Sequence, residues 1–185
     1  MKKLLSLVLA AMMLLTATFA LADMTETTND DGTTTVTTDN GATFTYSKDD
    51  FSVIISEDGT VEGVYLPETA ESVYFTIKVL ADTDAASYMA GVADAFGTEV
   101  MTDSAFFNEP DTVEWFVTDC EASDGENTII TSFYARNFDG GCYVVTVYSF
   151  YENNANEDTE VADEDLELAS TTALEQVLGS LSFAK

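Results

Sequence analysis

Apolar residues recur at every second position along most of this chain, in short runs that end at turn-forming residues. The clearest run is residues 72–80, where Val73, Phe75, Ile77 and Val79 share one parity. Because successive side chains of a strand point to opposite faces of a sheet, this period of two predicts β-strands. This pattern, together with β-forming residues and flanking turn signals, predicts strands at 33–38, 42–47, 51–56, 60–66, 72–80, 99–107, 112–120, 128–136 and 142–151. They predict a fold built mainly on an antiparallel sheet.

Turn signals join several of these strands as neighbours. Asp39-Asn40-Gly41 lies between the first two, and Asn-Gly supplies the positive φ angles of a tight hairpin. Asp124-Gly125 and Asp139-Gly140-Gly141 separate the last three strands, which predicts a meander. The last strand, 142–151, is apolar on both parities, as is typical of a central strand that is covered on both faces.

Two segments change to a helical period. In residues 84–96 the apolar side chains fall on one helical face, and Gly97 can take the left-handed conformation that ends a helix. A second apolar face spans residues 162–178, and residues 181–183 are expected to pack back as a short tail. The fold class predicted from this pattern is α+β: a mainly antiparallel sheet with two helices, arranged as an α/β/α sandwich.

The first 22 residues have the pattern of a secretory leader. Lys2 and Lys3 precede an apolar run, and Ala20-Leu21-Ala22 forms a cleavage site that places the mature start at Asp23. An uncleaved anchor is the alternative. The expected organisation is a signal peptide at 1–22, a Thr/Asp-rich linker and first hairpin at 23–41, and a single domain at 42–185. The linker is expected to be flexible to about Gly32.

Positive charge is nearly absent after the leader. Four basic side chains (Lys48, Lys78, Arg136 and Lys185) stand against 34 acidic ones, a net charge of −30. This charge opposes binding to nucleic acid and to anionic membrane surfaces, both of which attract proteins through Lys and Arg. An unknown extracellular or envelope protein is the expected partner, and the predicted location is secreted or extracellular.

The chain contains no histidine. This excludes Ser-His-Asp and Cys-His catalysis and also histidine-ligated zinc. An enzyme is therefore not expected, and no catalytic, cofactor-binding or metal-ligating residue is assigned. A small hydrolase that uses paired carboxylates is a second alternative, although close pairs arise by chance among so many acids.

Two residue types that often carry function have structural interpretations here. In the predicted meander, Cys120 lies opposite about Ile129 and Cys142 opposite about Asn137, too far apart for a disulfide. Both cysteines are expected to be free and mostly buried. Trp115 alternates with Val117, so it is expected in the core rather than on a sugar-binding surface.

Calcium binding is the first alternative function, and it would be weak. Calcium takes oxygen ligands, and acidic residues cluster at two places. The denser cluster is Glu157, Asp158, Glu160, Asp163, Glu164 and Asp165; the other is Asp119, Glu121, Asp124 and Glu126. Neither fits the EF-hand loop. The favoured interpretation of the first is a polar loop and a helix N-terminus stabilised by acids.

Two segments resemble the PsbP-like family. One is Phe44-Thr45-Tyr46-Ser47-Lys48-Asp49-Asp50-Phe51-Ser52-Val53, and the other is residues 174–178 followed by Gly179-Ser180-Leu181-Ser182-Phe183. The resemblance covers about residues 42–183 and is that of a distant, secreted bacterial member. It implies a PsbP-like sandwich fold and a non-enzymatic accessory or binding role. No binding residue is carried over. The function predicted from the sequence is a secreted, non-catalytic binding or accessory module with an acidic surface.

Overall fold

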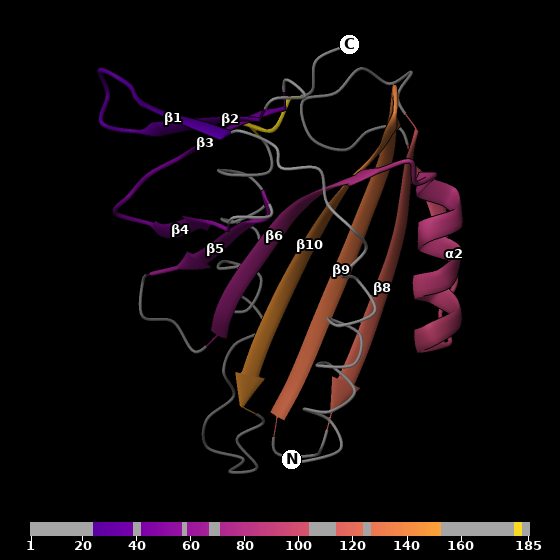
Figure 1. The fold of residues 1–185 in the computed structure, drawn as a ribbon. Coiled ribbons are helices and arrows are strands. Elements are labelled where there is room, and N and C mark those ends of the chain that lie inside the picture. Colours follow the sequence, from indigo (N-terminus) through magenta and orange to yellow (C-terminus); the bar gives the residue numbers. More distant parts are fainter. Residues whose placement is uncertain are drawn as a thin grey trace.

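A computed structural model describes residues 24–38, 42–56, 59–66, 71–103, 114–123, 127–152 and 180–182. These residues form two antiparallel sheets and one helix (Figure 1). The three-stranded sheet has the order β1-β2-β3, with β1 (Met24–Thr28), β2 (Thr34–Thr38) and β3 (Thr43–Tyr46). The seven-stranded sheet has the order β4-β5-β6-β10-β9-β8-β7. Its strands are β4 (Phe51–Ile55), β5 (Val61–Tyr65), β6 (Glu71–Ala81), β7 (Met101–Asp103), β8 (Trp115–Ser123), β9 (Asn127–Phe138) and β10 (Gly141–Glu152).

The predicted fold class, an α/β/α sandwich with two helices, is wrong. Within the described residues the one helix is α2 (Ala85–Phe96), and it covers only one face of the large sheet (Figure 1). The opposite face packs against the small sheet, whose Val36 and Phe44 share a core cluster with Phe75. Burial on two faces indicates two covering layers, but it does not say whether each layer is a helix or a sheet. The predicted helix at 162–178 lies outside the described residues.

The prediction that β10 is central and covered on both faces is confirmed. It lies between β6 and β9, with Val145 opposite both Ile77 and Tyr134. Val145 belongs to the core cluster shared with the small sheet, whereas Val144 belongs to the cluster under α2. The predicted meander of β8, β9 and β10 is also confirmed by their antiparallel pairing.

The first hairpin is confirmed, but the linker before it is not. Strands β2 and β3 pair antiparallel around 39–41, with Thr37 opposite Thr43. Residues 24–28, expected to be flexible, instead form β1 and pair along all of β2. The hydroxyls of Thr35 on β2 and Thr45 on β3 lie 3.0 Å apart and form a hydrogen bond across the two strands. A threonine-rich composition therefore marks a strand here, consistent with the high β-propensity of threonine.

Helix α2 begins and ends where the sequence predicts. The Asp84 side chain accepts a hydrogen bond from the Ser87 backbone N–H at 2.9 Å, and Gly97 adopts the left-handed conformation at φ 70°. Asn137 on β9 fixes the same end of the helix, because its side-chain oxygen accepts from the Ala85 N–H at 2.7 Å. One turn further on, this capped end holds Tyr88 beside the large sheet.

Residues 180–182 return to the start of the fold. Leu181 is fully buried in the core shared by the two sheets, as expected for the packed tail, and Phe183 lies outside the described residues. Ser182 exchanges two backbone hydrogen bonds of 2.8 Å with Thr43 on β3. Of the strand predicted at 99–107, residues 101–103 form β7 and residues 104–107 lie outside the described residues.

Candidate functional site

The outer face of the large sheet, on the side of α2, is only partly covered by described residues. Helix α2 packs Met89 and Val92 over Phe133 and Val144, at the β8, β9 and β10 side of the sheet. Towards β4 and β5 the same face carries Ile54, with 62% of its surface exposed. The boundary between the covered and open parts runs along β6 and β10.

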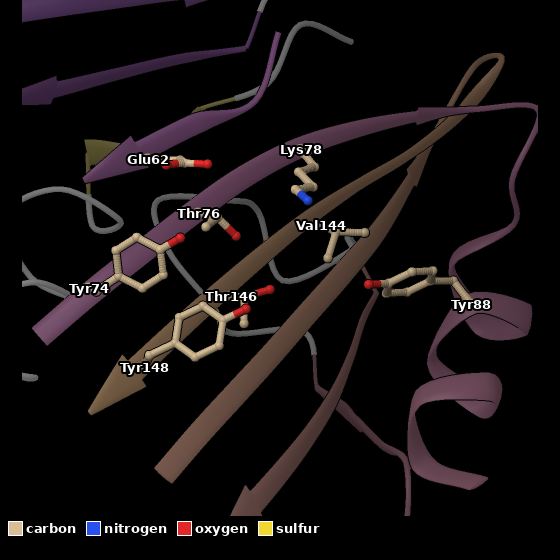
Figure 2. Close-up of a pocket in the computed structure, with 8 residues that line it drawn as sticks. All are labelled: Glu62, Tyr74, Thr76, Lys78, Tyr88, Val144, Thr146 and Tyr148. Carbon is tan, nitrogen blue, oxygen red and sulfur yellow. The ribbon is translucent and has the colours of Figure 1, made fainter. Parts of the chain in front are cut away.

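A cavity of about 150 Å³ lies at this boundary (Figure 2). Strands β5, β6 and β10 provide its floor and most of its rim, and α2 contributes Tyr88 from the side (Figure 2). The lining residues are Glu62, Tyr74, Thr76, Lys78, Tyr88, Val144, Thr146 and Tyr148. They bring aromatic rings, hydroxyls, one carboxylate and one ammonium group to the same small volume.

Strand register explains why these side chains meet. Tyr148 on β10 lies opposite Tyr74 on β6, and the next row on this face contains Thr146 and Thr76. Glu62 on β5 extends that second row, because it lies opposite Thr76. Directly opposite side chains on one face of an antiparallel pair lie close enough to interact. The described residues that line the cavity therefore lie on strands and on α2 rather than in loops.

Tyr74 and Tyr148 form an aromatic pair at one end of the cavity. Their ring centroids are 5.0 Å apart and their planes are inclined by 35°. In Figure 2 the two rings lie side by side and turn their broad faces to the same side. The hydroxyl of Tyr88 points towards the cavity from α2 (Figure 2). Such rings offer a ligand apolar surface together with a polar edge.

The three phenols are held in their neutral form. Burial is the main cause that raises the pKa of Tyr88 and Tyr148 far above the ordinary value, and burial also raises the pKa of Tyr74. The nearby carboxylate of Glu62 raises the pKa of Tyr74 and Tyr148 further. Each phenol therefore keeps its proton at physiological pH and can donate a hydrogen bond to a ligand.

Glu62 and Lys78 supply opposite charges at the cavity, and both are half-buried. Lys78 on β6 lies opposite Val144, next to the row that contains Glu62. Within the described residues, neither side chain is in an ion pair. The cavity thus presents one positive and one negative group that are free to pair with a ligand.

The residues considered from the sequence lie elsewhere. Trp115 is fully buried, which confirms its place in the core. Both cysteines are free and buried, as predicted. Cys142 lies opposite Asn137 as expected, and Cys120 lies opposite Thr131 rather than Ile129. Burial raises the pKa of Cys142 to about 12, so its thiol is unreactive at neutral pH.

Neither acidic cluster is gathered into a site within the described residues. Asp119 and Glu121 are both exposed on β8, on either side of the buried Cys120, and no group of three metal-ligating side chains occurs in this part of the chain. Asp124, Glu126 and the cluster from Glu157 to Asp165 lie outside the described residues.

The sequence reasoning missed the cavity, although the polar side of β6 indicates it. Tyr74, Thr76 and Lys78 occupy the second parity of β6, opposite to its apolar parity. A strand with a fully apolar face and a second face of tyrosine, threonine and lysine indicates a surface that is only partly covered. The pairing of β6 with β10, which completes the site, could not be derived from that pattern.

Comparisons with known proteins leave the family of this chain open. No protein-family model and no curated protein matches it. Among solved structures, LpqN, involved in cell envelope biogenesis of Mycobacterium tuberculosis, is 11% identical with a TM-score of 0.45, over 88% of this chain and 92% of that one. A structure from Bacteroides thetaiotaomicron is 9% identical with a TM-score of 0.44, over 78% of this chain and 45% of that one. Similarity at this level transfers no function. The described part of the chain contains no helix that is long and apolar enough to cross a membrane.

Proposed function

We propose that the protein is an exported, non-catalytic binding module whose ligand binds in the tyrosine-lined cavity. The observation that carries the proposal is the convergence of Tyr74, Tyr88 and Tyr148 with Glu62 and Lys78 on an open part of the sheet. Ligand sites are typically concave, with aromatic walls and a few polar groups that fix orientation. The secretory leader supports export to the envelope or the medium.

The composition of the cavity supports binding rather than catalysis. Glu62 is the one carboxylate among the described residues that line it, whereas glycoside hydrolysis ordinarily uses two. The chain has no histidine to act as a general base, and the raised pKa values keep the phenols protonated. The lining groups can therefore hold and orient a ligand through stacking, hydrogen bonds and charge.

The cavity is formed by strand-borne side chains, so it is expected to be largely preformed. Thr76 and Thr146 on its floor are buried, and their strands pair along their length. A preformed site loses little conformational entropy when the ligand binds. The cavity is small, about 150 Å³, which suits a small ligand or one group of a larger one.

A ligand panel tests this function on the purified protein, expressed with its own leader. The panel contains neutral oligosaccharides, short peptides and small zwitterions, and NMR follows the tyrosine ring signals. We expect at least one class to shift the signals of Tyr74 and Tyr148 in a saturable manner. The Tyr148→Ala variant should weaken that binding about tenfold, because it removes half of the aromatic pair.

Ile130→Ala is the matched control, since Ile130 is an exposed residue on the opposite face of the same sheet. It should leave the affinity unchanged. Saturable binding that survives in Tyr148→Ala, or the absence of binding by every class in the panel, would contradict this function.

A further inference from the structure

We propose that the ligand of the cavity is a zwitterion with a methylated ammonium group at one end and an anionic group at the other. This inference rests on the proposed function, because it specifies the ligand of the same site. It follows from the two opposite charges at the cavity, which form no ion pair with any described residue, and from the aromatic pair beside one of them.

The aromatic pair and Glu62 suit the cationic end of such a ligand. An ammonium group over the face of a tyrosine ring is attracted by the ring quadrupole, and aromatic sites of this kind bind quaternary ammonium compounds. Glu62 lies opposite Thr76, one row from the pair formed by Tyr74 and Tyr148. Burial is the main cause of the raised pKa of Tyr74 and Tyr148, and the Glu62 carboxylate adds to it in both. A methylated ammonium group in this place meets both the rings and the carboxylate.

Lys78 suits the anionic end. It lies four residues beyond Tyr74 on β6, roughly 13 Å along the strand, and its side chain turns back towards the cavity (Figure 2). The hydroxyl of Tyr88 points to the same region and can donate a hydrogen bond (Figure 2). A carboxylate or a phosphate diester would pair with this ammonium group and this hydroxyl. Glu62 occupies the row next to Lys78, roughly 7 Å away along the strand direction, so a compact ligand whose two charges are a few bonds apart can meet both groups.

Net charge separates a zwitterion from the other ligand classes. The net charge of −30 repels a simple anion at long range, although Lys78 could bind one locally. A simple cation would leave Lys78 unpaired, and a neutral sugar would use neither charge. A ligand without net charge approaches the acidic surface without repulsion and pairs with both groups.

Four small probes, measured by calorimetry and by the tyrosine NMR signals, separate these classes. Glycine betaine is the zwitterion, tert-butylacetate is its isostere with carbon in place of the charged nitrogen, choline carries the cation alone, and a neutral trisaccharide carries no charge. We expect glycine betaine to bind about tenfold more tightly than each of the other three probes. Equal binding of tert-butylacetate, choline or the trisaccharide would overturn the inference.

Charge variants test the two ends separately. Glu62→Gln and Lys78→Met should each weaken glycine betaine binding about tenfold. The controls Glu26→Gln and Lys48→Met make the same charge changes at exposed positions away from the cavity, and they should change the affinity by less than about twofold. If the cavity and control variants change the affinity equally, the ligand responds only to the total charge of the protein and not to Glu62 or Lys78, which also overturns the inference.

Two further ligands identify the source of the zwitterion. Glycerophosphocholine presents the phosphate diester in solution, and vesicles of pure phosphatidylcholine present the same group on a bilayer. Binding of the soluble form alone points to a small solute, and binding of both points to a lipid headgroup. If Tyr148-dependent binding is found for the trisaccharide and for no zwitterion, the inference fails while the proposed function stands. If neither these probes nor the short peptides of the ligand panel bind, both fail.

Discussion

At Gly63 on β5, the effect of one added methyl group is decided by the ring of Phe75. A Cβ atom at this position would overlap that ring. The ring is held in the core, with its centroid 5.9 Å from that of Phe51 and 6.4 Å from that of Phe44. We expect Gly63→Ala to lower the free energy of unfolding by about 1–3 kcal/mol, the usual cost of overpacking a core. Urea denaturation measures this change.

At Gly91 the same substitution, glycine to alanine, is expected to stabilise the protein rather than destabilise it. It is exposed in the middle of α2, and nothing lies within 4 Å of an added Cβ atom. Gly91→Ala should raise the free energy of unfolding by about 0.5–1 kcal/mol, because glycine loses more backbone entropy in a helix than alanine does.

For the first of these two variants, a Gly63→Ala protein as stable as the wild type would show that the Phe75 ring can move aside without cost.

At the scale of elements, the stability of α2 depends on the charge of Asp84. Its carboxylate accepts hydrogen bonds from the backbone and side chain of Ser87 and from Asn137, and these bonds lower its pKa from the ordinary value of 3.8. Because the folded-state pKa is lowered, the stabilisation is complete above pH 3.8 and is lost as the pH falls through the folded-state value. We expect Asp84→Ala to lower the melting temperature at pH 7, with a difference from wild type that shrinks below pH 3.8.

Asp84→Asn is the control for this cap, since asparagine caps a helix as well as aspartate does but does not titrate. Its melting temperature at pH 7 should lie closer to that of the wild type than that of Asp84→Ala. A difference between wild type and Asp84→Ala that stays constant from pH 7 to pH 3 would mean that the carboxylate charge does not contribute.

The elements that could be predicted from the sequence are those specified by local rules. The cap at Asp84, the stop at Gly97 and the hairpin around Asn40-Gly41 each depend on a few neighbouring residues. Strand β1 was missed because every residue after Met24 in it is polar, and its conformation is stabilised by pairing with β2. The α/β/α arrangement was wrong for a related reason, since the layer that covers Phe75 is set by distant packing with Phe44.

The cavity illustrates the same limit. Each lining residue lies within a strand or helix that the sequence predicted, but the site requires Tyr148 to lie opposite Tyr74, more than 70 residues earlier in the chain. Register between such distant strands follows from the packing of the whole sheet rather than from either segment. In the sequence, Glu62 is one of 34 acidic residues and Lys78 is one of six basic residues. Their position at the cavity, which only the structure shows, distinguishes them from the others.

At the scale of the whole molecule, charge is the dominant constraint. Acidic side chains outnumber basic ones by 30 after residue 22, so the folded chain repels itself more strongly than an extended chain would. Dissolved ions screen this repulsion, with a Debye length of about 10 Å at 0.1 M ionic strength. Added salt is therefore expected to stabilise the fold, whatever its cation.

This expectation separates general screening from the calcium alternative. We predict that Ca²⁺ and Mg²⁺, at matched ionic strength, raise the melting temperature by the same few degrees without saturating, and that NaCl acts in the same direction. A specific calcium site would instead raise the free energy of unfolding by RT ln(1 + [L]/Kd), where [L] is the free Ca²⁺ concentration, and Mg²⁺ would not produce the same curve. Such a curve, abolished by Asp163→Asn with Asp165→Asn, would contradict screening and place calcium at the acidic cluster. Unchanged curves in that double variant would show that its carboxylates act only through the total charge of the molecule.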